Sequence, residues 1–178
     1  NEPGVSNEVL SRLVDSQKTL SRLTRIVKAL LYISKIENDQ YNKSEEVSIR
    51  ELCEEVIEEL AERIEEKSIK INTSFESDFV YKPCNRSLIH TMVFNVVSNA
   101  IKYTKSDGEI SLDGKMSGEA YQLTISDTGV GIPSEHIPFI FDRFKRFRPE
   151  DGMSYGLGLP IVKSIASFHK IGLHVESQ

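Results

Sequence analysis

The chain has 178 residues, of which 39% are hydrophobic and 28% charged, and its net charge is −5. This length can hold one full domain plus an additional element, and the apolar content is sufficient for a substantial core. The negative charge, without basic stretches interleaved with aromatic residues, argues against nucleic-acid binding, and no apolar run is long enough to span a bilayer. Cys53 and Cys84 lack metal-type spacing and are predicted to have no functional role.

A long helix is predicted over residues 6–38. Leu13, Leu20 and Val27 recur every seven residues along it. Such an apolar stripe is not stable alone and predicts a bundle or a coiled-coil dimer. We therefore expect residues 1–38 to belong to a dimerisation region and the polar residues 39–47 to form a linker.

Residues 48–178 are predicted to form a second domain in which helices and strands are mixed. A capping box at residues 48–51 starts an amphipathic helix whose opposite face is rich in glutamate. Alternation and periodicity then predict the following elements in chain order: strands near 69–71 and 79–81, a helix over 86–103, a hairpin from 110–115 and 121–126, a helix over about 159–168, and a final short strand at 173–176.

The predicted helix at 86–103 carries three polar residues on one face. Asn95, Asn99 and Lys102 stand at positions i, i+4 and i+7, and Tyr103 lies beside them. Amide oxygens are hard ligands that suit Mg²⁺, and an ammonium group can neutralise phosphate charge. This face is therefore a candidate site for a magnesium-bound triphosphate.

Two glycine-rich segments complete the candidate site. Asp127 can accept a hydrogen bond from an exocyclic amine, while Gly129 and Gly131 let the backbone approach a flat base. The second segment runs into the helix predicted from about residue 159, whose first N–H groups can hold phosphates; it consists of Gly156, Leu157, Gly158 and Leu159. The combination predicts an ATP site.

In order and spacing, these segments resemble the sequence boxes of sensor histidine kinases. Residues 95–103 resemble the N-box, 127–131 the G1-box, 141–144 the F-box and 156–159 the G2-box. In addition, residues 20–38 resemble the second helix of the dimerisation hairpin, and 145–155 resemble the ATP lid. The resemblance implies the α+β class, with a two-layer α/β sandwich preceded by a long dimerisation helix.

The same resemblance implies a function and a set of site residues. The expected activity is transfer of the ATP γ-phosphoryl group to a histidine, for relay to an aspartate of a response-regulator receiver domain, with ATP and Mg²⁺ as cofactors. The expected assembly is a homodimer through the N-terminal helix, in the cytoplasmic part of a bacterial sensor whose membrane segments lie outside this chain. The implied catalytic residues are Asn95, which also binds the metal, and Lys102; the implied nucleotide contacts are Asn99, Tyr103, Asp127, Gly129, Gly131, Gly156, Leu157, Gly158 and Leu159.

The sequence departs from the family pattern in two respects. The acceptor motif of the His-Glu-x-x-x-Pro kind is absent, since none of the four histidines is followed by Glu. We therefore expect that this chain by itself does not autophosphorylate. The family pattern also continues beyond residue 178 with a glycine turn and one more strand, which predicts one unpaired sheet edge.

Two alternative functions remain at this point. A serine kinase of the anti-sigma-factor type shares the N- and G-boxes, although the long heptad helix argues against it. A non-catalytic dimerising scaffold is the second alternative, and the intact Asn95, Lys102, Asp127 and paired glycines argue against that.

ATP-hydrolysing relatives carry a carboxylate at the position of Asn95, so the amide here predicts slow water attack.

Overall fold

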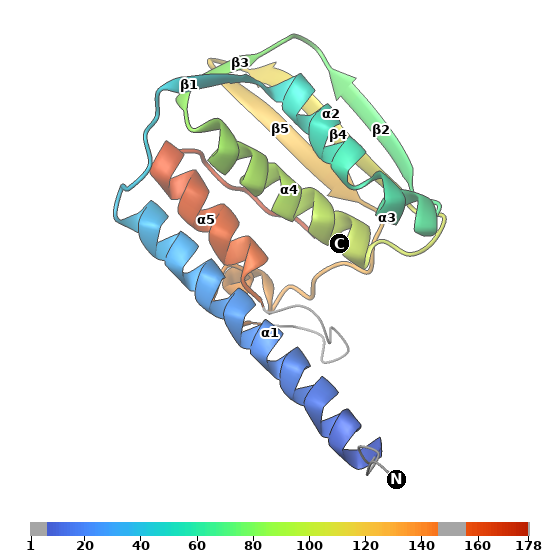
Figure 1. The fold of residues 1–178 in the computed structure, drawn as a ribbon. Helices are drawn as coiled ribbons and strands as arrows, with labels where there is room; N and C mark the ends of the chain where they lie inside the picture. Colours follow the sequence, from blue (N-terminus) through green and yellow to red (C-terminus); the bar gives the residue numbers. More distant parts are fainter. Residues whose placement is uncertain (1–6, 146–155, 178) are drawn as a thin grey trace.

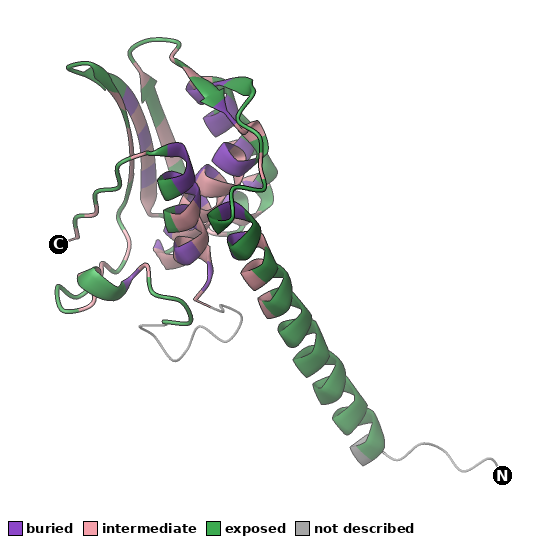
Figure 2. Ribbon diagram, turned by 90° about the vertical axis from the view of Figure 1, so that its left-hand side faces the viewer, coloured by how far each residue is buried: buried purple, intermediate pink, exposed green. Residues whose placement is uncertain are grey.

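The computed structural model of the chain describes residues 7–145 and 156–177. It begins with the 31-residue helix α1 (Asn7–Glu37), in agreement with the helix predicted over 6–38. This helix projects from the rest of the molecule, and most of its length is exposed (Figures 1 and 2). Only its C-terminal end packs on the body, where Ile33 and Ile36 are buried. None of the described helices is both long and apolar enough to cross a membrane.

The body of the molecule is a helical layer that covers one face of a sheet (Figure 1). The sheet has the order β2-β4-β5, with β2 parallel to β4 and β4 antiparallel to β5, and a separate ladder pairs β1 with β3. This arrangement confirms the predicted α+β class with a two-layer sandwich. The elements are β1 (Glu45–Ser48), α2 (Ile49–Glu59), α3 (Ala61–Glu66), β2 (Lys70–Phe75), β3 (Val80–Cys84), α4 (Arg86–Tyr103), β4 (Glu109–Ser117), β5 (Ala120–Asp127), the 3-10 helix η1 (Ile137–Phe139) and α5 (Gly158–His169).

The capping box starts α2 as predicted, because the Ser48 side chain accepts the N–H of Glu51. The helix ends at Glu59, with Leu60 as its C-cap, and α3 continues the same apolar face with Ile64. Strand β1 begins at Glu45, so regular structure starts inside the range 39–47 that was predicted as linker.

Helix α4 has the predicted bounds and the predicted division into two faces. Its N-cap Asn85 accepts the N–H of Leu88 through its side chain. Val93 and Val97 point into the core, whereas Asn95 and Asn99 are half-buried on another face. The 3.6-residue period thus places the polar face of α4 at the surface while its apolar face fixes the helix to the sheet.

The β4–β5 hairpin brings Asp127 to the edge of the body. Its register runs from Ile110 opposite Asp127 to Ser117 opposite Ala120. Gly118 has φ +64° in the two-residue turn, a conformation that glycine adopts without strain. Both strands are longer than predicted, because pairing continues to the turn.

The strand predicted at 173–176 is wrong, since residues 171–177 form no regular structure. The alternation of Leu173 and Val175 is a local signal, but a strand also needs a hydrogen-bonded neighbour. In the described part of the chain the sheet stops at β5. The C-terminal segment is joined to the body by the Ile132 N–H, which donates to the Ser177 hydroxyl at 2.7 Å. Strand β5 is consequently an edge strand in this structure.

Two hydrophobic clusters hold the molecule together. The main one lies between the sheet and helices α2 and α4, and it includes Leu52, Val97 and Leu112. A smaller one joins the end of α1 to α4 and α5; its buried members are Ile36, Leu88, Ile165 and Phe168. Both cysteines are buried and free, and burial raises the pKa of the Cys53 thiol to about 12. That thiol therefore stays protonated at neutral pH.

Candidate functional site

The predicted site residues come from three elements that meet at one side of the body: the end of α4, the end of β5 with its following loop, and the start of α5. Gly158 opens α5 directly against α4. A Cβ atom built on Gly158 would stand 3.0 Å from Asn95 Oδ1 and 3.9 Å from Asn99 Nδ2. The absence of a side chain thus lets the N-terminus of α5 approach both amides.

The Asn95 side chain is oriented by its own helix. Its Nδ2 donates to the Thr91 carbonyl at 2.8 Å, one turn earlier. The amide oxygen is thereby turned toward Gly158 and remains an acceptor. An oxygen held in this way is suited to a hard cation, which is the role predicted for Asn95.

Asp127 and Gly129 form a tight turn at the end of β5. One carboxylate oxygen, Oδ1, accepts the Gly129 N–H at 2.8 Å. A Cβ atom on Gly129 would stand 2.5 Å from that oxygen and 2.7 Å from the Tyr103 carbonyl, so a side chain does not fit here. Asp127 is exposed, and its second carboxylate oxygen can still accept a hydrogen bond from a ligand amine.

The loop after β5 is fixed to the last turn of α4. The Val130 N–H donates to the Tyr103 carbonyl at 3.3 Å, and Thr128 binds Glu109 through both its backbone N–H and its hydroxyl. The residues that follow Asp127 are therefore bound both to the end of α4 and to the start of β4.

Lys102 and Tyr103 act as a pair at the end of α4. The Lys102 ammonium donates to the Tyr103 hydroxyl at 3.0 Å and lies 4.5 Å from the ring centroid. Both side chains are half-buried. The pair offers positive charge and a hydroxyl to an anionic ligand.

The start of α5 is suited to an anion. Its N-cap, Leu157, provides no side-chain cap, and Pro160 in the first turn has no N–H to satisfy. The N–H groups of Gly158 and Leu159 lie at the positive end of a 12-residue helix. Gly158, at the first position of this helix, lies close to the Asn95 oxygen.

Gly156 and Gly131 both have a backbone conformation typical of turns, and Gly156 packs against residues 144–145 rather than against the amides of α4. Gly156 has φ +64°, its carbonyl accepts the Phe144 N–H at 3.0 Å, and a Cβ atom on it would stand 2.5 Å from the Lys145 carbonyl. Gly131 also has φ +64°. The predicted lid over 145–155, with Arg146 and Arg148, lies outside the described residues except for Lys145.

Sequence reasoning missed the residues that hold the site in shape. Thr91 orients Asn95 through its carbonyl, and Thr128 ties the ends of β4 and β5 together. Lys67 donates to three carbonyls at the end of α4. The first interaction follows the i−4 spacing of a helix and was detectable, whereas the Lys67 contacts depend on tertiary packing.

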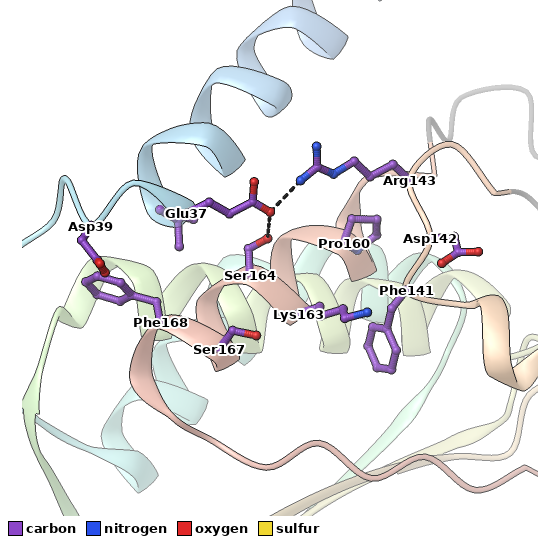
Figure 3. A pocket seen from close by; sticks show the side chains of 11 residues that line it. Glu37, Asp39, Phe141, Asp142, Arg143, Pro160, Lys163, Ser164, Ser167 and Phe168 are labelled. Atoms are coloured by element: carbon purple, nitrogen blue, oxygen red, sulfur yellow. Dashed lines mark hydrogen bonds and ion pairs between the residues drawn. The ribbon is translucent and has the colours of Figure 1, made fainter.

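A cavity of about 580 Å³ lies elsewhere, between the end of α1, the F-box segment and α5 (Figure 3). None of the predicted site residues lines it. Across its wall, Arg143 and Ser164 both bind Glu37, at 2.6 and 3.3 Å. The cavity therefore belongs to the junction between α1 and the body and is separate from the candidate site.

The oxygen donors of the candidate site are sufficient for Mg²⁺ only when a phosphate ligand supplies further oxygens. No cluster of three or more His, Cys, Asp or Glu side chains able to hold a metal occurs in the described ranges. Asn95 supplies one oriented oxygen, and the adjacent start of α5 favours phosphate oxygens, which can complete the shell. The chemistry of these residues thus agrees with a cation that arrives bound to phosphate.

Comparison with known proteins gives three kinds of match. Residues 84–178 match the family described as histidine kinase-, DNA gyrase B-, and HSP90-like ATPase. The chain is 30% identical to the adaptive-response sensory kinase SasA of Gloeothece citriformis over 91% of its own length, and it spans less than half, 42%, of that relative.

Two solved structures share the fold. The catalytic domain of the histidine kinase ThkA, in a nucleotide-free form, is 26% identical with a TM-score of 0.62, and the match covers 69% of this chain and 79% of that one. Full-length ShkA in complex with AMPPNP is 22% identical with a TM-score of 0.68, and the match covers 92% of this chain and 35% of that one. The boxes, the sandwich and these matches agree: this chain belongs to the histidine kinase-, DNA gyrase B- and HSP90-like ATPase family, and its body has the fold of a histidine-kinase catalytic domain.

Proposed function

We propose that this chain is the ATP-binding catalytic part of a sensor histidine kinase, which transfers the γ-phosphoryl group of ATP to a histidine for relay to a response-regulator aspartate. The observation that carries the proposal is the contact of Gly158 with Asn95 and Asn99, which brings a helix N-terminus and two amides to one place. Phosphate oxygens and their cation need that combination of N–H donors and hard acceptors. The complex of ShkA with AMPPNP supports the same ligand class.

In this proposal each residue has a defined task. Asp127 accepts a hydrogen bond from the adenine amine through the carboxylate oxygen that does not bind the Gly129 N–H. Gly129, which has no side chain, leaves space for the base. Lys102 and Tyr103 meet the phosphate side. Asn95 offers its oxygen to Mg²⁺, which when bound would neutralise charge on the phosphates.

The site is suited to an external nucleophile. An amide has no basic group at neutral pH, so Asn95 does not activate water. An imidazole nucleophile needs little acid–base help, and the chain contributes mainly position and charge.

We further propose that, besides the response regulator, this chain binds another copy of itself through the exposed apolar side chains of α1, which include Leu13 and Leu20. The 31-residue helix α1 also argues against the serine-kinase alternative.

Calorimetric titration of ATP with Mg²⁺ tests the proposal. We expect the chain to bind ATP and Asp127→Asn to lose binding, because the amide has one acceptor oxygen and presents donors to the adenine amine. Asp113→Asn is a matched control on the neighbouring strand, three positions away from the residue opposite Asp127. Binding by neither the natural chain nor the control would contradict the proposal.

The transfer step needs a separate assay, in which a helical hairpin bearing the acceptor histidine is supplied. Formation of an acid-labile phosphoryl group on that hairpin is expected with the natural chain. The substitution Lys102→Met is expected to lower the rate through the phosphate side while preserving the fold.

A further inference from the structure

The last turn of α4 carries Lys102 and Tyr103, and the end of any helix leaves four carbonyls without intrahelical partners. The last i→i−4 bond of α4 runs from the Thr104 N–H to the Ala100 carbonyl at 2.9 Å, which leaves the carbonyls of residues 101–104. The Val130 N–H binds that of Tyr103 at 3.3 Å. The other three are all bound by one side chain from another element.

That side chain is Lys67, the C-cap residue of α3. Its ammonium donates to the carbonyls of Ile101 at 2.7 Å and of Lys102 and Thr104 at 2.8 Å each. An ammonium has three donors, so its hydrogen-bonding capacity is filled by these three acceptors. A positive charge at this position also stabilises the negative end of α4.

The backbone of Lys67 binds the same region. Its carbonyl accepts the Asp107 N–H at 2.9 Å, so both ends of the residue hold the segment that leaves α4. Lys67 is half-buried. Its contacts join α3 to the last turn of α4, which carries the side chains that we assign to the nucleotide.

The Lys67 ammonium and the loop after Asp127 bind neighbouring peptide groups. The Lys67 ammonium donates to the Lys102 carbonyl, and the Val130 N–H donates to the next carbonyl, that of Tyr103. A shift of this turn would therefore move Lys102 and Tyr103 together and would also disturb the loop on which Asp127 stands. Small displacements of this kind are expensive for binding, because the contacts need a defined geometry.

We propose that Lys67 is a positioning residue for the nucleotide: through its three carbonyl contacts it holds the last turn of α4, and with it Lys102, Tyr103 and the Asp127 loop, in the binding geometry. The inference rests on the proposed function. Lys67 itself does not touch the nucleotide and acts through the helix end.

The first test is calorimetric titration of ATP with Mg²⁺ into Lys67→Met. Methionine keeps the apolar stem but lacks the ammonium, and we expect roughly tenfold weaker binding. Lys105→Met is the matched control, since Lys105 is an exposed lysine next to the same helix end and makes none of the three contacts. Lys67→Arg is expected to restore binding only in part, because a planar guanidinium cannot direct three donors to converging carbonyls.

A second measurement separates positioning from a general loss of stability. The Lys67→Met change is repeated in a Lys102→Met background, in which one of the groups that Lys67 positions is already gone. We expect a smaller fold-loss of ATP affinity there than in the natural chain. An equal fold-loss in both backgrounds would overturn the inference, and so would unchanged affinity of Lys67→Met.

Amide hydrogen exchange makes the two possible failures distinguishable. We expect the Thr104 and Val130 amides to exchange faster in Lys67→Met and at the natural rate in Lys105→Met. Unchanged exchange with intact ATP binding would overturn the positioning role alone. No ATP binding by the natural chain would overturn the proposed function, and the exchange rates would still report whether Lys67 holds the turn.

Discussion

The two ends of α1 have similar apolar residues and opposite environments. Leu13 and Leu20 near the N-terminus are 59% and 66% exposed, whereas Ile33 and Ile36 near the C-terminus are 0% and 1% exposed. Figure 2 shows the same division, with the helix exposed along most of its length. At 100° per residue, Ile33 and Ile36 lie on roughly the opposite face of the helix from Leu13 and Leu20. The helix therefore has two apolar faces, and which of them is covered within one chain is decided by what else folds beside it.

At the C-terminal end the covering elements are α4 and α5. Ile36 packs with Leu88, Ile165 and Phe168, and the Tyr32 hydroxyl binds the Thr91 hydroxyl at 3.2 Å. The N-terminal end has no such cover in the described chain. The proposed second copy would supply it, and the comparison of the two ends can be tested residue by residue.

The largest effect is expected from Ile36→Ala. The substitution leaves a cavity in a fully buried cluster, and we expect a loss of about 2–4 kcal/mol in the free energy of unfolding. Urea denaturation followed by circular dichroism measures it. The same truncation at the exposed Leu20, at concentrations where the chain is monomeric, is expected to change stability by about 0.5 kcal/mol or less. Equal losses at the two positions would contradict the distinction between the ends.

The N-terminal end is tested by Leu20→Asp. If a second copy covers this face, a carboxylate buried there raises the dimer dissociation constant by about tenfold or more. Sedimentation equilibrium measures the constant. Ser21→Asp places the same charge on the next residue, outside the heptad stripe of Leu13 and Leu20, and is expected to have a smaller effect. A natural chain that stays monomeric at high concentration would refute the proposed dimer.

How far sequence predicts structure follows the same division between local and tertiary causes. The single face of Asn95, Asn99 and Lys102 follows from helix periodicity, and the cap at Ser48 from a four-residue signal, so both were predictable. Leu173 and Val175 alternate locally but have no neighbouring strand. Pairing is a tertiary event, and the prediction failed there.

The site shows the same limit. The glycines of the sequence predicted places where the backbone comes close to other groups. Only the fold showed that Gly158 lies against Asn95 while Gly156 packs against Lys145. Lys67 carries no local signal, because its three acceptors lie 34 to 37 residues further along the chain. Local patterns therefore identified the binding groups better than the residues that hold them in place.

A smaller, pH-dependent effect is expected where α5 ends beside the linker. His169 is buried and neutral: its Nδ1–H donates to the Ile165 carbonyl at 3.1 Å, and its Nε2 accepts the Asn85 N–H at 3.1 Å. Burial lowers the pKa of His169, the bond to Ile165 opposes this shift, and the charge of Lys43 adds to it. Because the pKa is lower in the folded state than the ordinary 6.5, the unfolded chain takes up the proton first as the pH falls. Stability is thus full above that value and declines below it, down to the folded-state pKa.

Urea denaturation between about pH 7.5 and 5.5 measures this effect. The decline in stability is expected to be smaller in His169→Gln than in the natural chain. His174→Gln removes an exposed histidine and serves as the control. Identical pH profiles of the natural chain and His169→Gln would contradict the assignment.

The smallest effect is expected from the polar contacts beside Ile36, where Glu37 accepts from Arg143 and Ser164 (Figure 3). Both charged side chains are nearly half exposed, at 48% and 45%, so water and salt screen the pair. A double-mutant cycle of Glu37→Gln and Arg143→Met is expected to give a coupling of about 0.2–1 kcal/mol at low salt, falling as salt is added. A cycle at the exposed Glu46–Lys82 pair, at 3.4 Å, gives the reference for a weak contact. A salt-independent coupling as large as the Ile36→Ala effect would mean that the ion pair, and not the apolar cluster, decides which end of α1 is attached. Because the pair is exposed, we expect instead that the cluster attaches the helix. The ion pair then only orients the F-box segment on α1.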